Sequence, residues 1–213
     1  MKSPAKLKTL LLSALFFLCA SAFADIKLPA PQMTGGKGIF DALKARSSAN
    51  LNHFPQNPLS LQELSNLLWA ATGLNRDEKG WTTPYGMGKA PYNKIYVASD
   101  KGVSLYDWKT HALKEISTKN IKSTVAKQPA VGSAPVILII VSDDKAMGNV
   151  TGQRARDWAH IASGAMSQNI YLAAASMNIG TRYIVNMNND VISKELKLHE
   201  NDIPINLMPL GKN

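Results

Sequence analysis

The chain has 213 residues, a formal net charge of +9 at pH 7 and one cysteine. This length suits one domain with a sizeable core. The basic excess is spread along the chain and is not interleaved with aromatic residues, so the composition does not favour a nucleic-acid-binding protein. The sequence shows neither the spacing of metal ligands nor a G-x-S-x-G nucleophile motif, which argues against a metalloenzyme or a serine hydrolase.

Residues 1–24 have the three parts of a secretory signal peptide. Three lysines precede an apolar run at residues 10–20, and an A-x-A pattern ends at Ala24. The apolar run is too short to span a membrane. Cleavage after Ala24 would remove the single cysteine, together with three lysines and no acids, which lowers the formal charge from +9 to +6. We therefore expect a periplasmic or secreted protein of one domain, residues 25–213, without disulfides.

The first part of the mature chain predicts an extended arm followed by two helices. Prolines and glycines between residues 25 and 38 oppose helix formation. A short helix is expected at residues 39–46. A second helix begins at the capping box of Ser60 and Glu63 and ends at Gly73, because its apolar residues recur with helical spacing. This pair of boundaries is the best defined in the sequence.

The next part predicts a long loop and several strands. Residues 75–91 are rich in glycine and proline, and loops of this length in a compact domain are often functional. Residues 94–99 and 103–108 predict a β-hairpin. Residues 134–141 form a β-branched apolar run that is typical of a buried central strand. A further strand is expected at residues 182–185, and the mixture of elements predicts an α+β domain.

A long helix is expected to organise the chain. It extends from Gln153 to Asn178, and Gly180 is placed to end it. Its two sides are both apolar, which predicts burial on nearly all sides. We consider two alternatives, a helix of the core and a central helix whose exposed stripe also forms a subunit interface. One side carries Ile161, Ala165, Gln168, Leu172 and Ala175, and the other Met166, Ile170, Ala173, Ala174 and Met177.

Five separated segments resemble the flavin-dependent nitroreductase superfamily, and within it the branch of the SagB-type thiazole/oxazole dehydrogenases. Residues 46–50, RSSAN, resemble the R-R-S-x-R motif that binds the flavin phosphate. Residues 58–73 are similar to the first long helix of the family, and residues 167–180, SQNIYLAAASMNIG, to its central helix. Residues 83–96 resemble its flavin-side loop and strand, and residues 209–211 its closing P-x-G.

The resemblance implies a nitroreductase-like fold, in which a mixed, mostly antiparallel sheet is packed with helices around a long buried helix. It also implies FMN as cofactor and a homodimer with flavin sites between the subunits. The implied chemistry is hydride transfer between flavin N5 and a small organic substrate, either in nitro or quinone reduction or in azoline-type oxidation. Since the flavin carries this chemistry, the resemblance assigns no catalytic side chain.

The implied cofactor-binding residues fall into a phosphate segment, a loop of close backbone approach, a strand beside the ring and a C-terminal cation. In an extended phosphate segment, the first, third and fifth residues would point the same way. Glycines in the loop would permit the close approach. In chain order the residues are Arg46, Ser47, Ser48 and Asn50, then Gly86, Met87, Gly88 and Lys89, then Ile184, Val185 and Asn186, and finally Lys212.

The sequence departs from the family pattern at two places. Ser47 and Asn50 replace arginines of the phosphate motif, and the loop lacks the asparagine that contacts the flavin. The alternative function is therefore that of a degenerate family member that has lost the flavin and binds a small molecule or peptide. Export also disfavours NAD(P)H as electron donor, because it is scarce outside the cytoplasm, so an oxidase or another electron carrier fits better.

Overall fold

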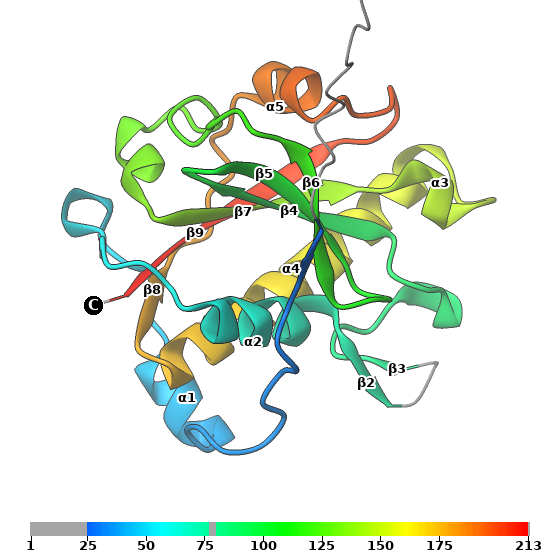
Figure 1. Cartoon of the computed structure of the whole chain (residues 1–213). Helices are drawn as coiled ribbons and strands as arrows, with labels where there is room; N and C mark the ends of the chain where they lie inside the picture. The colour runs from blue at the N-terminus through cyan, green and yellow to red at the C-terminus, as the bar shows by residue number, and fades with distance from the viewer. Residues whose placement is uncertain (1–24, 77–79, 213) are drawn as a thin grey trace, which may run out of the picture.

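The computed structural model describes residues 25–76 and 80–212, so the expected signal peptide lies outside the described residues. A seven-stranded sheet forms its centre, in the order β1-β6-β5-β4-β7-β9-β8 (Figure 1). Every ladder in it is antiparallel. The strands are β1 (Ile26–Lys27), β4 (Asn93–Ser99), β5 (Gly102–Asp107), β6 (Ala112–Ser117), β7 (Val136–Ser142), β8 (Ile179–Thr181) and β9 (Pro204–Lys212).

Helices cover both faces of this sheet and confirm the predicted α+β class. On one face, Leu138 and Ile140 of β7 pack with α2 (Leu61–Thr72) and α4 (Gly152–Ser176). On the other face, the alternate residues of β7 pack with residues 121–131 and with α5 (Asn189–Glu195). Figure 1 shows α5 on one side of the sheet, and α2 and α4 on the other. The apolar run of β7 is therefore buried on both sides, as its composition predicts.

The capping box at the start of α2 is confirmed. The Glu63 N–H donates to the Ser60 hydroxyl at 3.2 Å, and the Ser60 N–H donates to the Glu63 carboxylate at 2.7 Å. Gly73 is the C-terminal cap of the helix. The short helix α1 (Ile39–Ala45) is also present, and it ends one residue early because Arg46 is its cap in an extended conformation.

The central helix α4 is buried on one side only. Met166, Ile170 and Ala174 lie in the core, whereas the Ile161 side chain is 71% exposed and Gly164 is exposed. The prediction of burial on nearly all sides is therefore wrong for a single chain. Because the exposed stripe contains an isoleucine and a glycine, this burial pattern agrees with the alternative in which the helix also forms an interface.

The end of α4 also differs from the prediction. Asn178, with φ of +56°, takes the left-handed position that we expected of Gly180. Gly180 lies inside β8, where an added Cβ would be 2.7 Å from Cγ of Pro55. The strand expected at residues 182–185 is wrong, because the chain pairs with β9 as soon as α4 ends and Ile184 forms only an isolated bridge with Leu207.

Several elements were not predicted. The expected loop at residues 75–91 contains a 3₁₀ turn and most of a two-stranded sheet, and further short strands and helices lie before and after it. They are β2 (Leu74–Arg76), β3 (Gly80–Trp81), η1 (Leu51–His53), η2 (Gly86–Gly88), η3 (Pro129–Ser133) and α3 (Asp144–Met147), together with β6, α5 and β9. Within residues 25–76 and 80–212, no helix is long and apolar enough to cross a membrane.

Candidate functional site

The phosphate segment that follows α1 gathers on Tyr171 of α4. The guanidinium carbon of Arg46 lies 5.2 Å from the centre of the Tyr171 ring. The hydroxyl oxygens of Ser48 and Tyr171 are 2.8 Å apart, and the Tyr183 N–H donates to the Tyr171 oxygen at 2.8 Å. Because the phenol can donate its own proton to Ser48, the Ser48 hydroxyl retains a proton for a further acceptor such as a phosphate oxygen.

A pocket of about 170 Å³ lies beside this cluster and is lined by Ser47, Tyr171 and Thr181, among others. The Thr181 hydroxyl is buried and has no hydrogen-bond partner among the described residues. Lys37, on the rim, donates to the carbonyl of Ala175 at 2.8 Å and so satisfies the C-terminal end of α4. An unpartnered buried hydroxyl costs free energy unless a ligand or water satisfies it, so Thr181 is a candidate partner for a hydroxyl- or phosphate-bearing group.

Two of the predicted phosphate residues already have partners in the chain. The Asn50 side-chain oxygen accepts the N–H of Asn52 at 2.9 Å and caps η1, a contact that does not use the amide N–H donors of Asn50. Lys212 forms an ion pair with Glu63, with Nζ and Oε1 at 2.9 Å. Burial alone would raise the pKa of Glu63, but hydrogen bonds from Lys212 and Ser60 outweigh it and lower that pKa.

The predicted ring-side segment is tied to the phosphate segment. Arg182 donates to the carbonyl of Ala49 at 3.1 Å, which links the two segments. Ile184 exchanges backbone hydrogen bonds with Leu207 at 3.0 and 2.9 Å, and its side chain belongs to the core. By contrast, the Val185 side chain is 65% exposed and Asn186 is also exposed. Of the three residues, only Val185 and Asn186 therefore have side chains that are accessible from solvent.

A neighbouring segment was missed by the sequence analysis. The Lys127 N–H donates to the carbonyl of Asn186 at 3.0 Å, and Ala126 forms an isolated bridge with Met187. Gln128 has a buried side-chain oxygen that lacks a partner among the described residues. In the sequence this segment shows only a lysine and a glutamine before Pro129, a pattern that is equally typical of a solvent-exposed turn.

The predicted loop lies near the opposite end of α4. The Gly86 N–H donates to the Tyr92 hydroxyl at 3.2 Å, and a Cβ on Gly86 would lie 3.2 Å from the Trp158 ring. Met87 has a φ of +54° and is 80% exposed, Gly88 is also left-handed, and Lys89 follows as the cap of the turn.

The separation between this loop and the phosphate segment follows from α4 itself. Trp158 and Tyr171 are thirteen residues apart along the helix, or about 20 Å at ~1.5 Å per residue. One chain therefore does not bring the loop and the phosphate segment together.

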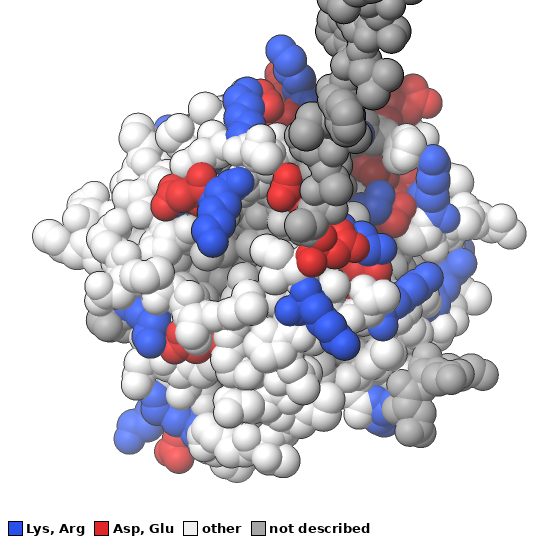
Figure 2. Space-filling view, viewed as in Figure 1, with Lys and Arg blue, Asp and Glu red and all other residues white. Residues whose placement is uncertain are grey.

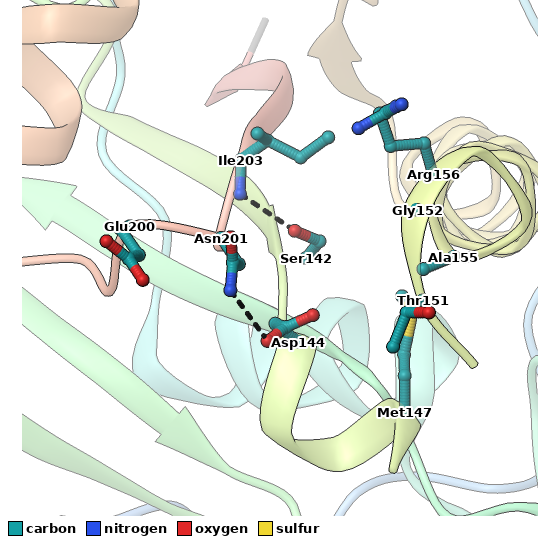
Figure 3. Close-up of a pocket in the computed structure, with 10 residues that line it drawn as sticks. All are labelled: Ser142, Asp144, Met147, Thr151, Gly152, Ala155, Arg156, Glu200, Asn201 and Ile203. Carbon is teal, nitrogen blue, oxygen red and sulfur yellow. Dashed lines mark hydrogen bonds between the residues drawn. The ribbon is translucent and has the colours of Figure 1, made fainter. Parts of the chain in front are cut away.

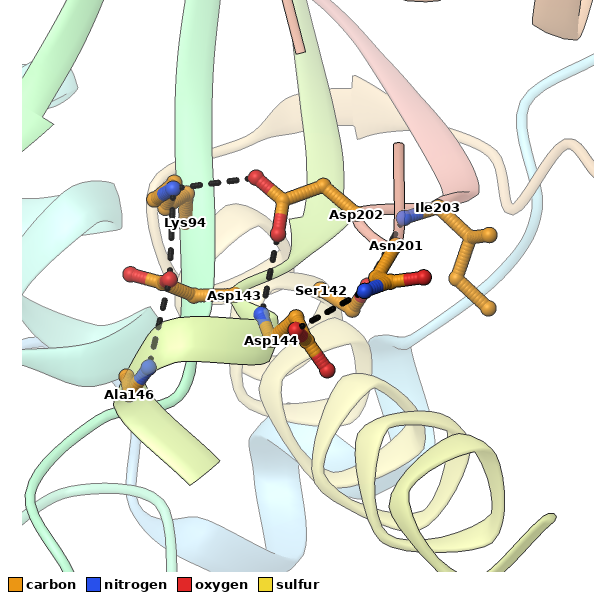
Figure 4. A network of polar contacts seen from close by, with 8 residues as sticks. All are labelled: Lys94, Ser142, Asp143, Asp144, Ala146, Asn201, Asp202 and Ile203. Atoms are coloured by element: carbon orange, nitrogen blue, oxygen red, sulfur yellow. Dashed lines mark hydrogen bonds and ion pairs between the residues drawn. The ribbon is translucent and has the colours of Figure 1, made fainter. Parts of the chain in front are cut away.

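A second, polar pocket of about 310 Å³ lies at the start of α4 and contains none of the predicted residues (Figure 3). Behind it, Lys94 pairs with Asp143 at 3.3 Å and with the buried Asp202 at 3.1 Å (Figure 4). Asp202 also accepts the N–H of Asp144 at 2.9 Å. Burial alone would lower the pKa of Lys94, but the two carboxylates raise it. This network holds β4, α3 and the start of β9 together, which is a structural role.

Comparison with known proteins decides the family. The model of the nitroreductase family matches residues 43–212. The chain belongs to the nitroreductase family. A protein of Methanocaldococcus jannaschii that is named as a nitroreductase is 31% identical to it over 182 residues, which cover 81% of this chain and 89% of the relative. The protein is thus an oxidoreductase of a family that typically uses a flavin.

Solved structures confirm the nitroreductase fold. A crystal structure of a nitroreductase-like protein from Ralstonia eutropha superposes with a TM-score of 0.82 at 32% identity and covers 88% of this chain and 89% of that chain. A chain of the Escherichia coli microcin synthetase complex superposes with a TM-score of 0.64 at 16% identity and covers 74% and 65% of the two chains. The second likeness concerns the fold alone.

Proposed function

We propose that this member of the nitroreductase family is an exported, FMN-dependent oxidoreductase that acts as a homodimer on a small organic substrate. The observation that supports FMN most directly is the cluster of Arg46 and Ser48 on Tyr171, next to the unpartnered hydroxyl of Thr181. A permanently charged guanidinium and free hydroxyl protons are suitable partners for a phosphate dianion.

Each part of the chain has a role in this proposal. Arg46 and Ser48 bind the phosphate, and the Thr181 hydroxyl binds the phosphate or the ribityl chain. Val185 and Asn186 flank the ring, which when bound supplies an N5 that accepts or donates a hydride. The exposed Met87 loop of a second copy would cover the ring and exclude water. Since Lys212 already pairs with Glu63, we expect it to help the phosphate only through its field.

A second candidate is a family member that binds a small molecule or peptide without flavin. It is favoured by the commitment of Lys212 to an ion pair with Glu63, because this pairing removes one cation that could otherwise bind a phosphate. The two candidates differ in one directly observable property, the presence of a bound flavin.

The test is the absorption spectrum of the protein purified from its exported form. We expect a yellow protein with a flavin band at about 450 nm. Chromatography of the heat-released cofactor should identify FMN and not FAD, because the proposal assigns Arg46 and Ser48 to a terminal phosphate dianion. A colourless protein that also fails to bind added FMN would contradict the proposal and leave the flavin-free candidate.

A further inference from the structure

An apolar cavity of about 320 Å³, which we call the arm pocket, lies between the N-terminal arm, the end of α2 and the turn from β5 to β6. Its volume is within the range of small-molecule sites, and most of its lining is apolar or aromatic, as in such sites. None of the predicted cofactor residues lines it. In Figure 1 the arm passes from β1 along α2 toward α1, on the side of α2 away from β8 and β9.

The aromatic walls of the arm pocket are preformed. The indole N–H of Trp69 donates to the carbonyl of Leu74 at 2.8 Å, which fixes the orientation of that ring. The Trp108 ring meets the edge of Trp81 with centres 5.7 Å apart and planes at 87°. Since each ring is held by another contact, a ligand that enters between Trp69 and Trp108 needs little reorganisation of either wall.

The remaining wall is the arm itself, which His111 holds in place. Nε2 of His111 lies 2.7 Å from the Ser65 hydroxyl and 3.1 Å from the carbonyl of Pro29, and Nδ1 lies 2.9 Å from the Tyr106 hydroxyl. These three contacts join the arm to α2 and to β5. Tertiary contacts therefore hold the arm wall of the arm pocket in place, and the pocket is open to solvent.

The charges around the arm pocket favour an anion. Lys27 and Lys109 are the charged side chains among its described lining residues, apart from the titratable His111, and both lysines are exposed. Asp107, two residues before Lys109, accepts the backbone N–H of Lys109 and pairs its other oxygen with Lys114 at 2.7 Å. Lys27 and Lys109 therefore lie at the rim of a pocket whose described lining contains no carboxylate.

We propose that the arm pocket binds a small aromatic carboxylate, with its ring between Trp69 and Trp108 and its carboxylate at Lys27 and Lys109. Rings stack favourably on tryptophan, and the apolar lining removes the ring of the ligand from water. The rim lysines select the charge of the ligand. This binding is independent of the proposed flavin and uses none of its residues.

The test is calorimetric titration of the mature protein, saturated with FMN to fill the cofactor site, with 2-naphthoate and with its neutral isostere 2-naphthamide. If the protein binds no FMN, the protein is titrated as purified. We expect one naphthoate per chain and roughly three- to tenfold weaker binding of the amide, since each exposed ion pair contributes about a two- to threefold effect.

Variants locate the probes. The double variant Lys27→Gln/Lys109→Gln should bind both probes equally, whereas the control Lys101→Gln, an exposed lysine in the turn between β4 and β5, should keep the preference. Trp108→Ala removes one wall and Ala30→Phe fills the pocket from the exposed arm, so each should weaken both probes at least about tenfold. Ala30→Phe does not disturb the core, because Ala30 is exposed.

Three outcomes would overturn the proposal. They are the absence of saturable naphthoate binding, equal affinity of the wild type for the two probes, and binding that Ala30→Phe and Trp108→Ala both leave unchanged. The last would place the probe elsewhere on the protein.

Discussion

Arg46 is the residue on which the proposed phosphate site depends. A hydrogen bond to a charged group contributes about 1.5–3 kcal/mol, so Arg46→Ala should weaken FMN binding by about ten- to a hundredfold. Arg46→Lys should recover only part of the affinity, because a lysine lacks the planar fork of donors. Titration of the apo-proteins, followed by flavin fluorescence, measures both effects.

A matched control for this prediction is Arg156→Ala, which removes an exposed arginine from the far end of α4. It should leave FMN affinity unchanged. If Arg46→Ala and Arg156→Ala bind FMN as well as the wild type does, Arg46 is only a surface residue at the end of a helix, and the phosphate is held by other cations.

His111 makes the attachment of the arm depend on pH. Burial lowers the pKa of His111, and the hydrogen bond to the carbonyl of Pro29 opposes this only in part. The folded state therefore binds the proton less tightly than the unfolded state, whose histidine has a pKa of about 6.5. The stability that the neutral imidazole contributes is fully present above about pH 6.5 and is lost as the pH falls toward the folded pKa.

The variant His111→Asn isolates this contribution, since asparagine tolerates the φ of +50° at this position. We expect it to be less stable than the wild type at pH 7.5 and to differ less at pH 5, because only the wild type loses the contribution of the neutral ring. Urea unfolding of both proteins at the two pH values gives the difference in unfolding free energy between wild type and variant. The contributions of the other titrating groups cancel in this difference. A difference that stays constant with pH would contradict the assignment.

At the scale of elements, the exposed stripe of α4 is the proposed dimer contact. An added Cβ on Gly164 meets no atom within 4 Å, so a large side chain there fits a single chain but not a close contact with a second helix. Gly164→Trp should therefore split the dimer and release FMN at the same time. Light scattering and flavin content, measured on one sample, test both.

The control for this prediction is Gly164→Ala, which keeps the surface thin and should raise helix stability by up to about 1 kcal/mol while the dimer persists. A wild type that is a monodisperse monomer at micromolar concentration would refute the interface outright. So would a Gly164→Trp variant that remains a dimer with its flavin.

The elements that the sequence predicted well are those with local signals. The capping box of Ser60 and Glu63 and the apolar run of β7 depend on neighbouring residues, and both were located to within two residues. The elements that were missed depend on partners far along the chain. β9 pairs with both β7 and β8, and the position of Gly180 in β8 is dictated by Pro55, none of which a local pattern shows.

In the candidate site, too, the sequence shows local motifs but not the partners that lie far along the chain. The motif located Arg46 and Ser48, but their common partner Tyr171 lies more than a hundred residues later and its role needs the fold. The assignment of Asn50 rested on an extended backbone, and the sequence did not show that its side-chain oxygen also caps η1. Lys127 belongs to no motif, so only its backbone contact with Asn186 places it beside the ring-side segment.

At the scale of the molecule, charge is not concentrated on the face shown in Figure 2, where lysines and arginines alternate with acids. This distribution does not favour a nucleic-acid partner on that face. We predict that the exported protein starts at Asp25, because the A-x-A pattern ends at Ala24. Intact-mass measurement of the protein from the periplasm or medium checks this, and a retained Met1 or a lipid on Cys19 would refute it.

The central proposal is that one flavin site takes its phosphate segment and its Met87 loop from different chains, because the two lie about 20 Å apart along α4 of one chain. Two variants divide the site between them. Arg46→Ala damages the phosphate half, and Met87→Asp places a carboxylate at the exposed tip of the loop without affecting the core of its own chain. Each variant alone should bind FMN weakly at both sites of its dimer.

The decisive measurement is the FMN stoichiometry of the mixed dimer, isolated from cells that express both variants with different affinity tags. In a mixed dimer, one site combines the intact phosphate half of one chain with the intact loop of the other, while the second site carries both defects. We predict one FMN per mixed dimer, bound with wild-type affinity. A mixed dimer that binds FMN no better than the parent variants would show that each site lies within one chain and would contradict the account.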